Sequence, residues 1–280
     1  MKLISPKADA KFLISSAAEW PAIAFETDGG GPHEWRWSIV WNNFKKSGIA
    51  HTPGNRWDAR TELTNYGGML TVNAQAGEAG KPPQVSAAIT VNLIGTNPSE
   101  AEATAYLATK ADGKGFDKIL KQEAGFRHFK NGEPIQSFDN GYGMCQLTKP
   151  VPAFEQIWNW KLNIDGGLVL FAQKRALALA HLAQSGRSYT AEQLTHEAVC
   201  RWNGGSYHEW DAGPGAWVRV RAILCDLKTG NIGWDMTKPA NQGKTETELH
   251  ARDSGTYNRP PGADANWRYS GVCYADHVLG

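Results

Sequence analysis

One carboxylate of this chain lies where a helix would normally bury an apolar side chain. Phe116, Ile119 and Leu120 have the i, i+3, i+4 spacing of one helix face, and Glu123 occupies the i+7 position of that face. Burial disfavours the charged form of a carboxyl group and raises its pKa, and a carboxyl group that keeps its proton near neutral pH can protonate a leaving oxygen. Glu123 is therefore a candidate general acid, although the position also suits an ordinary solvated glutamate at a helix end.

A glycine-rich run, from Asp139 to Thr148, follows this helix. Glycine permits the tight turns and close backbone approaches that ligand sites require. Gln146, within the run, offers both a hydrogen-bond donor and an acceptor. By itself the run could also be only a turn that leads into an apolar segment.

Two further polar turns come later in the chain. Asn163-Ile164-Asp165-Gly166-Gly167 opens a long helical pattern that continues to Leu182. A second helical stretch, beginning near Thr190, ends in the turn Arg201-Trp202-Asn203-Gly204-Gly205-Ser206-Tyr207.

The order of these segments, from about Ser99 onward, resembles the catalytic domain of soluble lytic transglycosylases and goose-type lysozymes, which cut the glycan strands of peptidoglycan. That family has a catalytic Glu usually followed by Ser, then Gly-Leu-Met-Gln with an aliphatic residue, then Asn-Ile with a Gly three residues later, then Ala-Tyr-Asn with a nearby Gly. The corresponding residues here are Glu123-Ala124, Gly143-Met144-Cys145-Gln146-Leu147, Asn163-Ile164 with Gly167, and Arg201-Trp202-Asn203 with Gly204 and Gly205.

The resemblance implies a muramidase that cleaves the β-1,4 bond between N-acetylmuramic acid and N-acetylglucosamine, without a cofactor or metal. Glu123 would protonate the glycosidic oxygen, and Asp139 is the residue best placed to act as a second carboxylate. The substrate-binding residues that the resemblance implies are Tyr142, Gly143, Gln146, Asn163, Trp202, Asn203 and Tyr207.

Two departures from the family pattern leave alternatives open. Ala124 replaces a Ser whose hydroxyl often supports the catalytic Glu, and Trp202 replaces a Tyr that contributes a phenolic hydrogen bond. The chain could hydrolyse the glycan with water, or close an anhydro ring as lytic transglycosylases do. A different class of function is an inactive glycan-binding module on a lysozyme fold.

Composition and charge limit the partners. A net charge of +1 does not favour a nucleic-acid partner, which would need a strongly basic face. The four cysteines, Cys145, Cys200, Cys225 and Cys273, lack the spacing of metal ligands, so we expect buried free thiols, although an even number also permits disulfides.

Two other polar groups resemble functional sites less closely. The segment from Tyr207 to Asp211 contains a His and two acids but lacks metal-ligand spacing, and its aromatic residues could instead line a sugar subsite. His196 and Glu197, within a helical stretch, are typical of a surface pair.

The expected place of action is the bacterial cell wall or periplasm. No apolar stretch approaches the roughly 20 residues that span a bilayer, and the segment from Met1 to Lys7 lacks the continuous apolar core of a signal peptide. We therefore expect release by phage lysis or export by a specialised secretion machine, as for phage endolysins or secreted antibacterial effectors. Delivery machinery and an immunity or inhibitor protein are the possible protein partners.

The elements that must position these residues belong to an α+β chain. Residues 1–97 contain three stretches of period-two alternation, which predict an accessory, antiparallel β-sandwich-like domain. These alternating stretches are Trp35, Trp37, Ile39 and Trp41; Leu70, Val72 and Ala74; and Val85, Ala87, Ile89, Val91 and Leu93.

Residues 98–280 are predicted to form the lysozyme-like α-helical domain, opened by a capping box at Ser99-Glu100-Ala101-Glu102. Its last part, about 229–280, is rich in turn residues and is expected to be an irregular tail anchored by Trp234, Trp267 and Tyr274. Because every candidate site residue lies after Asn97, we also expect a fragment that starts there to fold.

Overall fold

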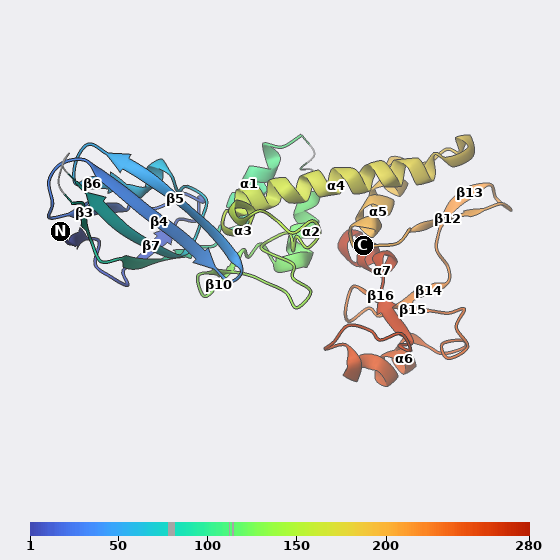
Figure 1. Cartoon of the computed structure of the whole chain (residues 1–280). Helices are drawn as coiled ribbons and strands as arrows, with labels where there is room; N and C mark the ends of the chain where they lie inside the picture. Colours follow the sequence, from blue (N-terminus) through green and yellow to red (C-terminus); the bar gives the residue numbers. More distant parts are fainter. Residues whose placement is uncertain (78–81, 112, 114) are drawn as a thin grey trace. The chain divides into compact units, whose positions relative to one another are not determined.

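The computed structural model describes residues 1–77, 82–111, 113 and 115–280 (Figure 1). Helices alternate with several antiparallel sheets, which confirms the predicted α+β class. The chain forms two compact units, which we call unit 1 (Met1–Gly167) and unit 2 (Leu168–Gly280). The boundary falls within helix α4 (Trp160–Leu182), whereas the predicted boundary lay near Asn97.

The N-terminal part of unit 1, up to Gly95, contains two β-sheets (Figure 1). The larger has the strand order β2-β9-β7-β4-β5, with β8 paired to β7, and the smaller has the order β1-β3-β6. Neighbouring strands are antiparallel except β2 and β9, which run parallel. The strands span Leu3–Ser5 (β1), Lys11–Ile14 (β2), Ala24–Thr27 (β3), His33–Trp41 (β4), Phe44–Thr52 (β5), Arg56–Asp58 (β6), Gly68–Ala76 (β7), Gln84–Val85 (β8) and Ile89–Gly95 (β9), with a 3-10 turn at Ala59–Thr61 (η1).

The two central strands, β4 and β7, form where apolar and polar residues alternate in the sequence. In β4 and β7 every second side chain is buried, so the predicted core positions of both strands are confirmed. The third predicted stretch is only partly correct, because Val85 and Ala87 are exposed and β9 begins at Ile89. Ser86 is the inward residue there: its backbone N–H and hydroxyl both contact the backbone of Ala74 in β7.

The two sheets share one hydrophobic core. Phe25 and Trp57 of the smaller sheet stack on each other, and Trp57 stacks on Trp35 of β4 with ring centroids 6.1 Å apart. All three side chains are almost completely buried. Large aromatic side chains contribute more buried apolar area than any others, so this cluster accounts for much of the stability of the sheets.

The helical part of unit 1 begins as predicted. Ser99 accepts the backbone N–H of Glu102, and the Glu102 carboxylate accepts the backbone N–H of Ser99, which completes the capping box. The elements of this part are α1 (Glu100–Ala108), α2 (Phe116–Ala124), β10 (Phe129–Lys130), β11 (Glu133–Pro134), α3 (Phe154–Trp158) and the first turns of α4.

The sheets and the helical part of unit 1 are not separate packing units. Phe129, Tyr142 and Trp158 belong to the same buried cluster as the inward residues of β4. Asn97 links the two parts, because its side-chain oxygen accepts the backbone N–H groups of His128 and Phe129, both at 2.7 Å. Removal of residues 1–97 would therefore expose core side chains, which argues against the expected independent folding of the remainder.

Unit 2 contains the remainder of α4, a hairpin, a three-stranded antiparallel sheet and three more helices. Helix α5 begins where predicted, because Thr190 and Gln193 form a reciprocal capping box. The elements span Gln184–Gly186 (η2), Ala191–Trp202 (α5), His208–Asp211 (β12), Ala216–Arg219 (β13), Ile223–Cys225 (β14), Ile232–Asp235 (β15), Glu246–Asp253 (α6), Ser254–Thr256 (η3), Trp267–Tyr269 (β16) and Gly271–Leu279 (α7).

The segment 229–280, which we expected to be irregular, is regularly folded. It supplies β15, α6, β16 and α7, and its predicted anchors Trp234, Trp267 and Tyr274 are all buried. Trp234 and Trp267 form a core of their own with Ile232 and Leu249. Its strands have only three or four residues and Leu249 is the one buried apolar residue of α6, so little periodicity is visible in the sequence.

The cysteines divide into two kinds. Cys225 of β14 and Cys273 of α7 form a disulfide across 48 residues, so the expectation of free thiols is wrong for this pair. Cys145 and Cys200 are buried free thiols, as expected. No helix among the described residues combines the length and apolar character needed to cross a bilayer.

Candidate active site

Helix α2 places Glu123 at the edge of an apolar face. Phe116, Ile119 and Leu120 are completely buried, and Glu123, in the last turn, is half-buried. Gly125 ends the helix in the left-handed conformation with φ of 56°. The predicted helix and its buried stripe are confirmed, and the carboxylate lies at the boundary between that stripe and solvent.

The glycine-rich run forms a compact loop between Tyr142 and Leu147. These two residues form an isolated antiparallel bridge, with reciprocal backbone hydrogen bonds of 3.0 and 3.1 Å. Gly143 has φ of 69°, and a Cβ there would lie 2.4 Å from the His128 ring and 2.8 Å from the Asn163 side chain. Only glycine fits this position, because both the conformation and the space exclude a side chain.

Asn163, in the first turns of α4, holds this loop. Its side-chain oxygen accepts the backbone N–H of Cys145 at 2.9 Å, and its side-chain nitrogen donates to the carbonyl of Tyr142 at 3.1 Å. Asn163 is completely buried. The side chain predicted to bind substrate thus uses its hydrogen-bonding groups on the loop backbone, and its role is to position the loop.

A buried histidine holds the same loop from the other side. The Nδ1 atom of His128 lies 3.1 Å from the backbone N–H of Met144, and its Nε2 atom lies 2.8 Å from the carbonyl of Ile157. Because an N–H can only donate and a carbonyl can only accept, His128 is neutral with its proton on Nε2. Burial lowers its pKa to about 4, although the Ile157 hydrogen bond partly opposes this shift.

Helix α2, the loop and α4 meet around Cys145. A Cβ on Gly167 would lie 2.7 Å from the Cys145 sulfur and 3.0 Å from the Phe116 ring, so α4 approaches both other segments closely. Burial raises the pKa of the Cys145 thiol well above its usual value, and the negative charges of Glu123 and Asp165 raise it further. Three of the four segments singled out in the sequence are therefore brought together in unit 1.

The remaining predicted residues of unit 1 differ in exposure. Tyr142 is 8% exposed and packs edge-on against Trp41 and Phe44, so it belongs to the core. Gln146 is half-buried, and its side-chain nitrogen donates to the carbonyl of Gly143 at 2.7 Å. Asp139 is exposed and accepts a hydrogen bond from the Ser137 hydroxyl.

The fourth segment lies in unit 2, at the end of α5. Asn203 is the C-terminal cap of the helix, and Trp202 packs edge-on against Phe171 with ring centroids 6.2 Å apart. The side-chain nitrogen of Asn203 and the Nε atom of Arg201 are buried and have no hydrogen-bond partner among the described residues. The hydroxyl of Tyr207 donates to Asp276 at 2.6 Å.

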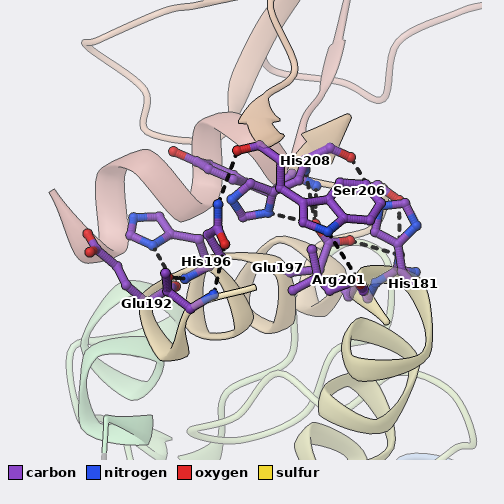
Figure 2. Close-up of polar contacts among 12 residues, drawn as sticks. His181, Glu192, His196, Glu197, Arg201, Ser206 and His208 are labelled. Atoms are coloured by element: carbon purple, nitrogen blue, oxygen red, sulfur yellow. Dashed lines mark hydrogen bonds and ion pairs between the residues drawn. The ribbon is translucent and has the colours of Figure 1, made fainter. Parts of the chain in front are cut away.

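Glu197 is the centre of a polar cluster beneath this turn (Figure 2). Its carboxylate is completely buried, which shows that the expected surface pair with His196 is wrong. One oxygen accepts the backbone N–H groups of Tyr207 and His208 at 2.9 and 3.0 Å and lies 3.2 Å from Nδ1 of His208. The other lies 2.8 Å from an Nη atom of Arg201.

The charge state of Glu197 follows from these partners. Burial alone would raise its pKa, but the hydrogen bonds from the side chain and backbone of His208 and the charge of Arg201 outweigh burial, so the pKa is lowered. Glu197 is therefore an ionised carboxylate. One of its oxygens accepts hydrogen bonds from Tyr207 and His208, and the other lies within ion-pair distance of Arg201 but accepts no hydrogen bond from the described residues.

Sequence reasoning did not find the buried contacts of His128 and Glu197. His128 stands in a segment without any motif, and its partners Met144 and Ile157 are distant in sequence, so no signal pointed to it. Glu197 and Arg201 do have the i, i+4 spacing of a helical ion pair, which could have indicated their contact.

Among the residues that the structure describes, no three His, Cys, Asp or Glu side chains are grouped as a metal site requires. In comparisons with known proteins, no protein-family model and no curated protein matches the chain.

Proposed function

We propose that the chain is a muramidase that cleaves the β-1,4 bond between N-acetylmuramic acid and N-acetylglucosamine, on a lysozyme-like helical fold. The observation that carries this proposal is the convergence of α2, the Tyr142–Leu147 loop and the start of α4 around Cys145, close enough to Glu123 for its negative charge to act on the Cys145 thiol. These are the segments in which the sequence resembles soluble lytic transglycosylases and goose-type lysozymes.

In the proposed reaction Glu123 donates its proton to the glycosidic oxygen as the C–O bond breaks. The oxocarbenium-like centre is then attacked by water or by the substrate's own N-acetyl and 6-hydroxyl groups. A half-buried position at the end of an apolar face suits this role, because a carboxyl group at the edge of that face can reach substrate.

The proposed glycan contacts in unit 1 come from the backbone of the Tyr142–Leu147 loop. Gly143 lets the loop backbone approach a ligand. Tyr142 and Asn163 act by holding the loop rather than by contacting sugar.

A lytic transglycosylase is the second candidate, and one observation favours it. Asp139, the predicted second carboxylate, is exposed and hydrogen-bonded to Ser137 rather than held in a buried catalytic position. A reaction without a protein base would close an anhydro ring within the substrate.

The disulfide supports action outside the cytoplasm. Disulfides such as Cys225–Cys273 form and persist in oxidising compartments, which include the bacterial periplasm. The cell wall is the proposed place of action, and a specialised secretion system or phage lysis is the proposed route.

Replacement of Glu123 by Gln tests the proposal. Gln is nearly isosteric but cannot supply a proton, and general-acid catalysis accounts for roughly 10²–10⁴ in rate. Clearing of purified peptidoglycan should therefore fall by at least about a hundredfold in Glu123→Gln. The matched control is Glu133→Gln, at an exposed glutamate of the same unit, which should clear peptidoglycan like the wild type.

A further inference from the structure

Phe138 is an aromatic side chain exposed at the tip of a turn. The residue is 72% exposed, although phenylalanine is usually among the most buried residues of a fold. It lies between β11 and the Tyr142–Leu147 loop, wholly within unit 1. A single exposed apolar side chain needs no special explanation, so the surroundings of Phe138 decide whether it has a role.

The turn that carries Phe138 is held by its own hydrogen bonds. The Asn140 N–H donates to the carbonyl of Ser137 at 3.1 Å. Ser137 also pairs with Gly141, because its N–H donates to the Gly141 carbonyl at 2.9 Å and its hydroxyl accepts the Gly141 N–H at 2.8 Å. The backbone beneath the ring is thus ordered in the free protein, which lowers the entropic cost of binding a ligand there.

Three exposed amide side chains lie at the base of this turn. Asn42, from the turn between β4 and β5, donates from its side-chain nitrogen to the side-chain oxygen of Gln136 at 3.3 Å. The side-chain nitrogen of Gln136 donates in turn to the side-chain oxygen of Asn140 at 2.9 Å. The Asn42 oxygen and the Asn140 nitrogen have no side-chain hydrogen-bond partner among the described residues. One acceptor and one donor therefore remain available next to an exposed ring.

This combination favours a neutral ligand that has both apolar C–H groups and hydrogen-bonding groups. A sugar ring has such a C–H face, which can stack on an aromatic ring, and its hydroxyl and acetamide groups match the free amide atoms. The turn itself carries one charge, the exposed carboxylate of Asp139, which disfavours a phosphate-rich ligand such as a nucleic acid.

We infer that Phe138, with the amides of Asn42, Gln136 and Asn140, forms a sugar-binding surface of unit 1 that takes an N-acetylated sugar of the glycan strand. This inference rests on the proposed function, and it gives the β4–β5 turn a part in substrate binding. The antiparallel bridge between Gln136 and Tyr142 joins the surface to the glycine-rich loop, so one glycan strand can contact both.

An NMR titration of the isotope-labelled full chain with hexa-N-acetylchitohexaose, a soluble oligomer of N-acetylglucosamine, tests the surface directly. The chain carries Glu123→Gln in this experiment, so that the oligomer stays intact. The side-chain NH2 signals of Asn42, Gln136 and Asn140 should shift in a saturable way, because a bound sugar changes the hydrogen bonds of these groups. If all three signals stay in place at the highest oligomer concentration, the inference is overturned.

Variants of the ring test the stacking contact. In the same Glu123→Gln chain, Phe138→Ala should raise the Kd for this oligomer about tenfold, the loss expected for one aromatic contact. Phe138→Trp should bind at least as tightly as the chain with Phe138, because its ring face is larger. The matched control is Leu13→Ala, at a 60% exposed apolar side chain of β2 in the same unit, which should leave the Kd unchanged. Equal Kd values for Phe138→Ala and Leu13→Ala would overturn the inference.

The two proposals fail in different ways. Binding of the oligomer that depends on Phe138, together with a wild-type chain that leaves peptidoglycan strands intact, would refute the proposed function and keep the sugar-binding surface. Cleavage of peptidoglycan that depends on Glu123, together with oligomer binding that is indifferent to Phe138→Ala, would refute only the surface.

Discussion

Lowering the pH from 7 to 5 should destabilise unit 1 through one buried histidine. In the folded chain burial lowers the pKa of His128 to about 4, whereas an unperturbed histidine has a value of 6.5. The folded state therefore binds fewer protons than the unfolded state between these values, and stability decreases as the pH falls through this window.

The size of the effect follows from the shift. Each pKa unit corresponds to about 1.4 kcal/mol, so His128 alone should remove about 2 kcal/mol between pH 7 and pH 5 and about 3 kcal/mol in full. Solvent screening does not reduce this stability change, because the His128 ring is completely buried. Protonation at Nδ1 would also remove the acceptor for the Met144 N–H, so the Tyr142–Leu147 loop should open first.

Pulse-labelling hydrogen exchange with mass spectrometry, at increasing urea and at both pH values, resolves peptides of unit 1 from those of unit 2. In His128→Gln, which keeps a donor and an acceptor but cannot be protonated, the pH-dependent loss in unit 1 should shrink by about 2 kcal/mol. His51→Gln, at an exposed histidine of β5, should behave like the wild type. Equal pH dependence in His128→Gln and the wild type would refute this reasoning.

Three further predictions concern packing. Loss of the Cys225–Cys273 disulfide should lower the stability of unit 2 by roughly 4 kcal/mol, the loop-entropy estimate for its 48-residue separation, and an unchanged melting curve in dithiothreitol would contradict this. A fragment of residues 98–280 should be insoluble, because Tyr142 and Trp158 share a core with β4; a soluble, cooperatively unfolding fragment would show otherwise. Gly167→Ala should destabilise unit 1 by about 1–3 kcal/mol in denaturant unfolding, although Gly to Ala normally stabilises a helix interior. A stabilised variant would mean that Cys145 and Phe116 move aside.

Periodic burial made part of this structure predictable. The strands β4 and β7 and helix α2 bury side chains at regular intervals, and Ser99 and Thr190 mark helix starts by a local hydrogen-bond pattern. The prediction of one alternating strand from Val85 to Leu93 was partly wrong, because Ser86 and Val91 both point inward. An odd spacing between two inward residues cannot occur in one regular strand, so the phase changes between them.

The site was less predictable, because the type of a residue does not show which way its side chain points. Asn163 and Tyr142 were predicted to bind substrate, and both side chains face the interior of unit 1. The pairing of Cys225 with Cys273 depends on the fold and is not encoded in cysteine spacing. Glu197 seemed to be a surface residue because nothing local shows that the chain returns over it at Tyr207 and His208.

Mass spectrometry of the fragments released from purified peptidoglycan, by the wild type and by Glu123→Gln, tests the central claim most directly. We expect glycan cleavage by the wild type, with reducing-end muropeptides for hydrolysis or anhydro-muropeptides for transglycosylation, and a loss of at least about a hundredfold in the variant. No glycan cleavage by the wild type, or equal release by a correctly folded Glu123→Gln variant, would contradict the assignment of Glu123 as the general acid.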